Sequence, residues 1–240
     1  MLGLKVRKMR RESCMSFWFP KIVDLIPVPL TKMIVLSDEQ TSDIGTILDR
    51  RRTDAFSTLC SEIKVAGDMV GWPAFLRTGQ GSGKHRWNET CFLQNYDQIG
   101  QHIYNLIEWS CMVDFLGLPY NIWVVREMLP VNALFRCQRY GGMPIVHEVR
   151  IFARNGDVQC VHPYWPEKAL QEGCPDISTW RELLPILNAS PPKEVLGWAS
   201  DASRAVDGYW SIDFLETKRG WFLTDMARGD ESFHADGCHS

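Results

Sequence analysis

The stretch with the clearest chemical potential is FLRTGQGSGKHRW, residues 75–87, which combines three glycines with Lys84. A glycine-rich loop followed by a lysine is a common way to hold phosphate groups. The G-x-x-x-x-G-K-[ST] pattern fails, because Thr78 replaces its first glycine and His85 replaces its metal-binding hydroxyl. The dinucleotide pattern G-x-G-x-x-G also fails, since its third glycine is missing. A phosphate loop of another kind and a plain flexible turn both stay open.

A second candidate is a pair of acids in GYWSIDFLETKRGWFLTDMA, residues 208–227, which predicts a hairpin. A three-residue loop, 218–220, with Gly220 in the left-handed conformation would place Asp213 opposite Asp225. Carboxylates so placed lie ~5 Å apart and repel each other unless something neutralises them. Mg²⁺ prefers such oxygen ligands, so the pattern indicates a metal site. The alternatives are a different register, or an aspartate that points into a turn.

A third candidate lies in IVHEVRIFARNGDVQCVHPYW, residues 145–165, which predicts a hairpin turned by Asn155-Gly156. Strand residues alternate between faces, so Glu148 and Arg150 are expected on the same face. Charged side chains among valine, isoleucine and phenylalanine need a partner or a ligand. An arginine there suits phosphate, and an ion pair is the alternative.

The elements that must position these groups alternate between helices and antiparallel strands. The apolar spacing predicts one or two helices in 44–70, and a further helix in 97–117 with Asp97 as N-cap and Gly117 as C-cap. Residues 17–31 are rich in proline and predict short extended pieces. The fold class is therefore α+β. Further strands are expected at 32–36, 72–78 and 121–131, and further helices at 176–188 and 192–206.

Composition bounds the class of protein. The 240 residues carry a net charge of -3, which gives no general attraction to nucleic acid or to an anionic membrane. The eight cysteines include no C-x-x-C pair, which argues against a zinc ribbon or a thioredoxin-type site. They favour free thiols in a reducing cytoplasm over a disulfide framework. No apolar run approaches the ~20 residues of a membrane span.

The two ends of the chain are polar. Residues 1–15 are basic and are expected to be a disordered extension, with a nucleic-acid-binding arm as the alternative. The tail FHADGCHS, residues 233–240, contains His234, Asp236, Cys238 and His239, which could bind a soft metal. A plain polar tail is favoured, because no second ligand pair is evident in the sequence. A domain boundary is expected near residue 72.

The chain resembles the ATP-grasp superfamily in three motifs and in their order along the sequence. The motifs are RTGQGSGKHRW, EVRIFARNG and TDMARGDESFH. They most resemble phage and bacterial ATP-grasp proteins related to the eukaryotic cell-division-cycle factor that assembles translation initiation factor two. The resemblance covers about residues 16 to 240. It implies an α+β ATP-grasp fold, in which ATP lies between two α+β lobes. A small N-terminal subdomain, 16–72, would precede the ATP-grasp domain, 73–240.

The resemblance implies Mg²⁺ and ATP as cofactors and assigns roles to residues. Arg77 matches the basic residue on the strand that touches the phosphates, and the loop from Gly81 to Lys84 would close over them. The strand Val125–Glu127 would read the adenine edge through its backbone, and Glu127 could bind the ribose or the adenine amine. The implied ATP-binding residues are Arg77, Gly81, Ser82, Gly83, Lys84, Val125, Arg126, Glu127 and Arg150.

Two of these residues, Lys84 and Arg150, would also serve catalysis. Asp213 and Asp225 match the Mg²⁺-binding acids of the family. The family often has an asparagine two residues after the last acid, where this chain has Ala227. Two aspartates would then suffice, or Asp230 or Glu231 would supply a further ligand. The substrate end is expected near His162, with Tyr164 and Trp165, and near Glu231; a structural turn is the alternative for 160–168.

The function implied is that of an ATP-dependent carboxylate–amine ligase that modifies a peptide or protein, activating a carboxylate as an acyl phosphate that an amine then attacks. An ATP-binding assembly factor or chaperone with little catalysis is the alternative. A nucleic-acid-modifying enzyme is suggested only by the basic start and the ten tryptophans. The expected partners are ATP and an unidentified acceptor, without a membrane or nucleic acid. The expected location is the cytoplasm, that of the host if the chain is viral.

Overall fold

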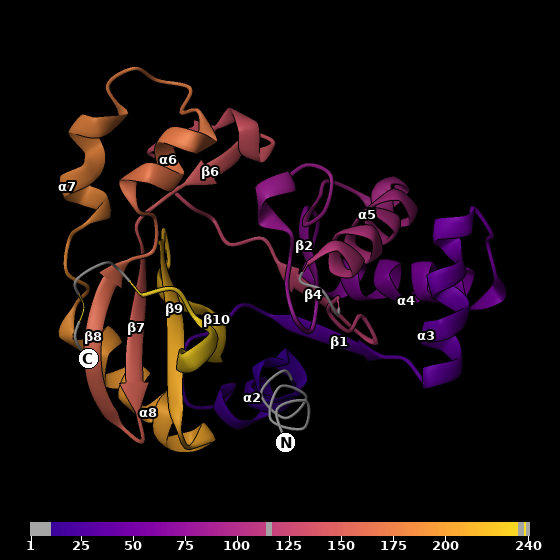
Figure 1. Ribbon diagram of the computed structural model, residues 1–240, viewed down its shortest axis with the longest axis horizontal. Coiled ribbons are helices and arrows are strands. Elements are labelled where there is room, and N and C mark those ends of the chain that lie inside the picture. The colour runs from indigo at the N-terminus through magenta and orange to yellow at the C-terminus, as the bar shows by residue number, and fades with distance from the viewer. Residues whose placement is uncertain (1–10, 114–116, 235–237, 239–240) are drawn as a thin grey trace. The chain divides into compact units, whose positions relative to one another are not determined.

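The computed structural model describes residues 11–113, 117–234 and 238 (Figure 1). They divide into two compact units. Unit 1 takes the chain up to residue 29, residues 129–138 and the chain from 144 onward, and unit 2 takes 30–128 and 139–143. Helices and antiparallel strands are mixed in both, which confirms the α+β class. No helix of the described residues is long and apolar enough to cross a membrane.

Unit 2 is built on a four-stranded antiparallel sheet with the order β1-β4-β2-β3. Because strand residues alternate, one face carries Ala74, Leu76 and Val125 into the main core of the unit. The opposite face carries Arg77 and Arg126. The strands are β1 (Thr31–Val35), β2 (Ala74–Thr78), β3 (Phe92–Leu93) and β4 (Ile122–Glu127).

Helices cover the apolar face of this sheet (Figure 1). A capping box, in which Ser37 and Gln40 bond each other's backbone, starts the first of them, and the Thr53 hydroxyl caps the second. The helices are α3 (Asp38–Gly45), a 3₁₀ turn (Thr46–Asp49), α4 (Asp54–Val70) and α5 (Ile99–Met112).

Helix α5 buries the predicted apolar stripe, but its ends differ from the prediction. A 3₁₀ turn, Tyr96–Gln98, precedes it, so the N-cap is Gln98 rather than Asp97. The helix ends at Met112, before Gly117, because Val113 already has extended backbone angles. The buried stripe consists of Ile99, Ile103, Leu106 and Ile107, whereas Cys111 is exposed.

Unit 1 is built on a second antiparallel sheet, with the order β10-β9-β7-β8. Helices α2 and α8 cover one face, where Phe17 stacks on Trp210 and Trp198 stacks on Phe214. The elements are α2 (Met15–Ile22), α8 (Lys193–Val206), β7 (Glu148–Arg154), β8 (Asp157–Pro163), β9 (Tyr209–Thr217) and β10 (Gly220–Arg228).

The predicted turn between β7 and β8 is confirmed. Asn155 and Gly156 both have positive φ, 51° and 99°, which a two-residue primed turn requires. The short elements escaped prediction, because few residues carry no periodic signal. They are β5 (Phe135–Cys137), β6 (Met143–Ile145) and α6 (Glu167–Gly173). The helix expected at 176–188 is shorter than predicted and consists of a 3₁₀ turn, Trp180–Leu183, followed by α7 (Leu184–Leu187).

The organisation near the N-terminus differs from expectation in three respects. Residues 15–22 form helix α2 instead of extended pieces, because Met15, Trp18 and Ile22 share a face that is wholly buried. The boundary expected near residue 72 falls inside unit 2, since β1 pairs with β4 in the same sheet as β2. Residues 11–15 are ordered, and residues 1–10 of the expected extension lie outside the described residues.

Candidate functional site

The centre of the candidate site in unit 1 is an ion pair across two strands. Register places Arg150 of β7 opposite Asp213 of β9. The guanidinium donates two parallel hydrogen bonds, from Nε to Oδ1 at 2.8 Å and from Nη2 to Oδ2 at 2.9 Å. Burial alone would lower the pKa of Arg150, but the Asp213 carboxylate more than offsets it, and the pKa is raised. The guanidinium therefore stays charged and fixed in orientation.

Asp225 of β10 lies directly opposite Asp213, as predicted. The route differs from the prediction. The turn has two residues, since Thr217 pairs with Gly220, and a bulge at Thr224 then inserts one residue into β10. A two-residue turn alone would have set Asp225 one place out of register, and the bulge restores the pairing. The same bulge lets Leu223 stay in the core.

A third acid, Glu148, shares this face. Glu148 and Arg150 lie two residues apart on β7, and the Glu148 carboxylate also raises the pKa of Arg150. Glu148 is only 7% exposed. Three carboxylates and one guanidinium on this face leave an excess of negative charge, which suits a divalent cation with hard oxygen ligands. The sequence had already placed Glu148 on this face but had given it no metal role.

The acids expected to replace the missing asparagine are engaged elsewhere. Ala227 lies opposite Ser211, so this position offers no side-chain ligand. The Glu231 carboxylate accepts a hydrogen bond from Ser13 at 2.8 Å, and Asp230 lies 3.7 Å from the Arg228 guanidinium. Both belong to a 3₁₀ turn, Gly229–Glu231, after β10. Glu148 is the better placed third acid.

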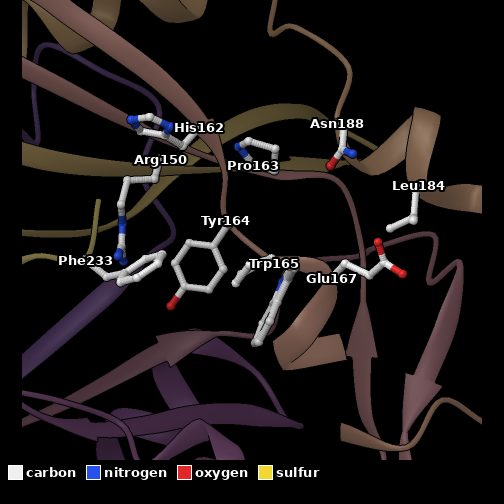
Figure 2. A pocket seen from close by; sticks show the side chains of 10 residues that line it. Arg150, His162, Pro163, Tyr164, Trp165, Glu167, Leu184, Asn188 and Phe233 are labelled. Carbon is white, nitrogen blue, oxygen red and sulfur yellow. The ribbon is translucent and has the colours of Figure 1, made fainter. Parts of the chain in front are cut away.

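A pocket opens beside this ion pair within unit 1 (Figure 2). The Arg150 guanidinium lies 4.8 Å from the centre of the Tyr164 ring, and Phe233 lies close to both in Figure 2. The pocket has a volume of about 230 Å³. Its lining brings together the residues expected near the acceptor, except Glu231. The lining residues are Arg150, His162, Pro163, Tyr164, Trp165, Pro166, Glu167, Leu184, Asn188 and Phe233.

In unit 2 the glycine loop is a tight turn packed on an indole ring. The Thr78 hydroxyl accepts hydrogen bonds from the N–H groups of Gln80 and Gly81. A Cβ on Gly81 would lie 2.5 Å from Cη2 of Trp109, so the loop needs glycine there for close approach. Gly83 has φ +58°. Packing against Trp109 therefore helps to determine the shape of the loop. Ser82, Gly83 and Lys84 follow the residues whose N–H groups bond Thr78.

A single 3₁₀ turn, Lys84–Arg86, follows the loop instead of a long helix. This explains why the G-x-x-x-x-G-K-[ST] pattern failed, since that pattern requires a helix after the lysine. His85 stacks on Tyr140 with the ring centres 4.3 Å apart. Partial burial, followed by the charge of Lys84, lowers the pKa of His85. Lys84 thus places its charge beside the loop.

Two buried arginines lie on the face of the unit 2 sheet opposite the core. Register sets Phe75 opposite Arg126 and Arg77 opposite Val124, so the two arginines are diagonal neighbours. Both are 3% exposed. Nε of Arg77 donates to the Thr78 carbonyl, and Nε of Arg126 donates to the Thr31 hydroxyl. Two buried cations on one face favour an anion there.

The strand expected to read adenine is committed to the sheet. Val125 and Arg126 pair with β1 on one side and β2 on the other. The N–H of Glu127 donates to the Leu30 carbonyl, and its carboxylate accepts from the Leu30 N–H at 2.9 Å. These backbone groups therefore present no edge for a base.

The comparisons define the class of fold. No family model matches the chain, and no curated protein does. Solved structures match with probability 1.00. The match to Cdc123 among them, with a TM-score above 0.5, shows that the chain has the α+β ATP-grasp fold, as the sequence predicted.

Among those structures is C-terminally truncated Cdc123 from Schizosaccharomyces pombe, with a TM-score of 0.53 and 13% identity over 92% of this chain and 85% of that one. The RimK domain protein ATP-grasp from Sphaerobacter thermophilus matches with a TM-score of 0.48 and 12% identity over 91% of this chain. D-alanine–D-alanine ligase from Bacillus anthracis matches with a TM-score of 0.47 and 10% identity over 92% of this chain. This chain spans 59% and 58% of these two structures. The likeness concerns the fold alone.

Proposed function

We propose that this chain binds Mg·ATP and uses it as an ATP-dependent carboxylate–amine ligase that modifies a peptide or protein, with the carboxylate activated as an acyl phosphate. One observation carries the proposal: Asp213, Asp225 and Glu148 lie with Arg150 on the face of the unit 1 sheet opposite α2 and α8. Carboxylates of like charge so close together suit a bound divalent cation. The ATP-grasp fold supports the same conclusion.

The residues present fit the proposed cofactors. Asp225, Asp213 and Glu148 would hold Mg²⁺, which when bound offsets negative charge on phosphate oxygens. Arg150 is a preformed fork of the kind that matches phosphate geometry. It would stabilise the charge that develops on the acyl phosphate.

In unit 2, Arg77, Arg126 and Lys84 are cations, and Ser82 and Gly83 offer backbone N–H groups at the loop tip. Such groups suit phosphate oxygens, so we propose these residues as the phosphate-binding set of this unit. We assign the adenine contact to the residues after Glu127, because the backbone of Val125 and Arg126 is paired with β1 and β2 in the sheet.

The pocket of unit 1 is assigned to the acceptor. Its volume of about 230 Å³ is below the ~300–1,000 Å³ typical of sites that enclose a whole small ligand. It is of a size for one side chain of a larger substrate. Arg150 lies at one end, so a carboxylate of that side chain would meet a cation.

An ATP-binding assembly factor with little turnover is the second candidate. The sequence resemblance to the eukaryotic cell-division-cycle assembly factor favours it, and Cdc123 is among the solved structures with a similar fold, at a TM-score of 0.53. The Arg150–Asp213 pair also favours it, because both Asp213 oxygens already accept hydrogen bonds from the guanidinium. Turnover would require this pair to loosen.

Two measurements separate the candidates. Mg·ATP at millimolar concentration should raise the melting temperature, because a ligand that binds only the folded state stabilises it. Incubation with ATP, Mg²⁺ and a host extract should then yield ADP and phosphate for a ligase. AMP and pyrophosphate would indicate adenylyl transfer, and binding without turnover would favour the assembly factor. The absence of any melting shift would refute both candidates.

The matched pair for these assays is Asp225→Asn and Asp157→Asn. Asp157 is an exposed aspartate at the start of β8 in the same sheet. The first variant should lose the Mg·ATP shift, while the second should keep it. Equal loss in both variants would mean that the shift reports on general charge rather than on this site.

A further inference from the structure

A cluster of soft metal ligands lies on unit 1, separate from the acidic set. Cys160 and His162 are two residues apart on β8, so they project from the same face of this edge strand. His234 and Cys238 come from the C-terminal tail. One ligand atom from each of the four side chains lies within 4.8 Å of all the others. The fold thus supplies the second ligand pair that the sequence did not reveal.

The separations are close to those of a tetrahedral site. Zinc bonds of about 2.0–2.3 Å to nitrogen and sulfur place neighbouring ligand atoms roughly 3.3–3.8 Å apart. Nε2 of His162 lies 3.1 Å from Sγ of Cys160, and Nδ1 of His234 lies 4.0 Å from the same sulfur. Shifts of a few tenths of an ångström to about one ångström would bring all four atoms onto one ion.

The surroundings of His234 orient it as a ligand. Its Nε2 lies 2.7 Å from the Tyr209 hydroxyl, so the proton on Nε2 can be donated to that oxygen. This leaves the lone pair of Nδ1 directed at the cluster. The imidazole also stacks on Phe152 at 3.6 Å between ring centres. A second-layer hydrogen bond that fixes the ring and its tautomer is a regular feature of metal-binding histidines.

We propose that Cys160, His162, His234 and Cys238 form a zinc site. Two thiolates and two neutral imidazoles balance the charge of Zn²⁺, which suits partly buried side chains. The sulfur ligands favour zinc over Mg²⁺ or Ca²⁺, which prefer oxygen. All four ligands are of intermediate burial, so an ion has access.

The site would tie the tail to the sheet beside the pocket. His162 belongs to both the cluster and the pocket lining, and Phe233, which also lines the pocket, precedes a ligand in sequence (Figure 2). Zinc would therefore hold one wall of the pocket in place. The zinc site stands independently of the proposed function, because none of its ligands belongs to the acidic set.

The test uses the full chain, free of affinity tag, reduced and stripped of metal without nucleotide. Titration with Zn²⁺, followed by native mass spectrometry, should show one zinc per chain. Titration with Co²⁺ should give the thiolate charge-transfer and tetrahedral d–d bands, which zinc then displaces. Cys160→Ser and Cys238→Ser should each abolish these bands. Cys111→Ser, an exposed cysteine on α5, should leave them unchanged.

Tyr209→Phe provides a finer measure, since it removes only the oxygen that orients His234. Zinc affinity should fall about 10- to 100-fold, as for other second-layer partners. Circular dichroism checks that each variant is folded. The proposal is overturned if the reduced wild type binds no zinc, or if Cys238→Ser binds it as tightly as wild type. A Cys160–Cys238 disulfide, with no metal uptake after reduction, would also overturn it.

Discussion

Arg150 and Asp213 face each other across β7 and β9 and are joined by two parallel hydrogen bonds of 2.8 and 2.9 Å. Asp225 faces Asp213 from the other side. Asp213 thus lies between a cation and an acid. The charge of Arg150 stabilises the Asp213 carboxylate, and the charge of Asp225 destabilises it. This asymmetry predicts different outcomes when Asp213 or Asp225 is replaced.

The first prediction compares the two aspartates. Asp225→Asn removes like-charge repulsion, so without metal the protein should be as stable as wild type or more stable by some tenths of a kcal/mol. Asp213→Asn breaks the pair with Arg150 and should cost about 3 kcal/mol. This is the low end for buried pairs, because 20% of the Arg150 side chain is exposed. Urea unfolding without metal measures both, and equal stability of the variants would contradict the ion-pair assignment.

The second prediction concerns the packing of the glycine loop. Gly81→Ala should destabilise the protein by about 1–3 kcal/mol, because the new Cβ would lie 2.5 Å from the rigid Trp109 ring. Adding Trp109→Phe should recover part of this loss, since phenylalanine lacks the outer ring atoms.

Gly197→Ala is the matched control for this pair. Gly197 lies inside α8 with nothing within 4 Å of an added Cβ, so alanine should stabilise by about 0.5–1 kcal/mol. Thermal melting of the three variants and the wild type measures these effects. An unchanged melting temperature for Gly81→Ala would show that the loop can move away from Trp109.

The third prediction is a pH dependence that arises in unit 2. His102 is 3% exposed, and Nδ1 lies 2.8 Å from the Thr90 carbonyl. Burial is the main effect and lowers the pKa of His102. Because the unfolded chain then binds the proton more readily, stability should fall as the pH drops below about 6.5, by at most about 1.4 kcal/mol per pH unit. Above about pH 7.5 the contribution should be constant.

His102→Gln tests the source of this dependence. Urea midpoints measured between about pH 5 and 8 should be flatter in the variant than in wild type. His85, whose pKa is also lowered, provides a second variant, His85→Gln, and the double variant should show the sum of the two changes. Parallel pH curves for His102→Gln and wild type would rule out His102.

The fourth prediction tests the ordered residues 11–15. The Ser13 hydroxyl accepts from the Arg228 N–H at 3.1 Å and donates to Glu231 at 2.8 Å. Ser13→Ala should therefore cost about 1 kcal/mol. Ser61→Ala is the control, because Ser61 bonds only its own helix α4 and alanine favours a helix. If both variants melt like wild type, the chain before Met15 contributes no stability, as the sequence had suggested.

Local chemistry accounts for the predictions that succeeded. The Asn155-Gly156 turn follows from residues that tolerate positive φ, and the shared face of Glu148 and Arg150 follows from strand alternation. The pairing of Asp213 with Asp225 was predicted with a turn one residue too long, and the unforeseen bulge made up the difference. The resemblance supplied the fold, which no local pattern specifies.

Features that depend on distant residues could not be predicted. Helix α2 contains Pro20, which reads locally as a break, and it forms because its buried face packs in unit 1. The four soft metal ligands include Cys160 and His234, 74 positions apart, which meet only through the fold. Val125 pairs with two strands because β4 lies between β1 and β2 in the sheet. This strand order could not be predicted from the sequence.

The bulge at Thr224 also determines where this hairpin can change in length. Deleting Thr224 would leave the Cα register of all the other residues of β9 and β10 unchanged, since the register skips this residue between Leu223 and Asp225. Deleting Arg219 from the turn would instead break the two-residue connection between Thr217 and Gly220. In a relative whose hairpin is one residue shorter, the alignment gap therefore belongs inside the strand. A gap placed by habit in the turn would misalign residues 220–223 and set core positions against surface ones.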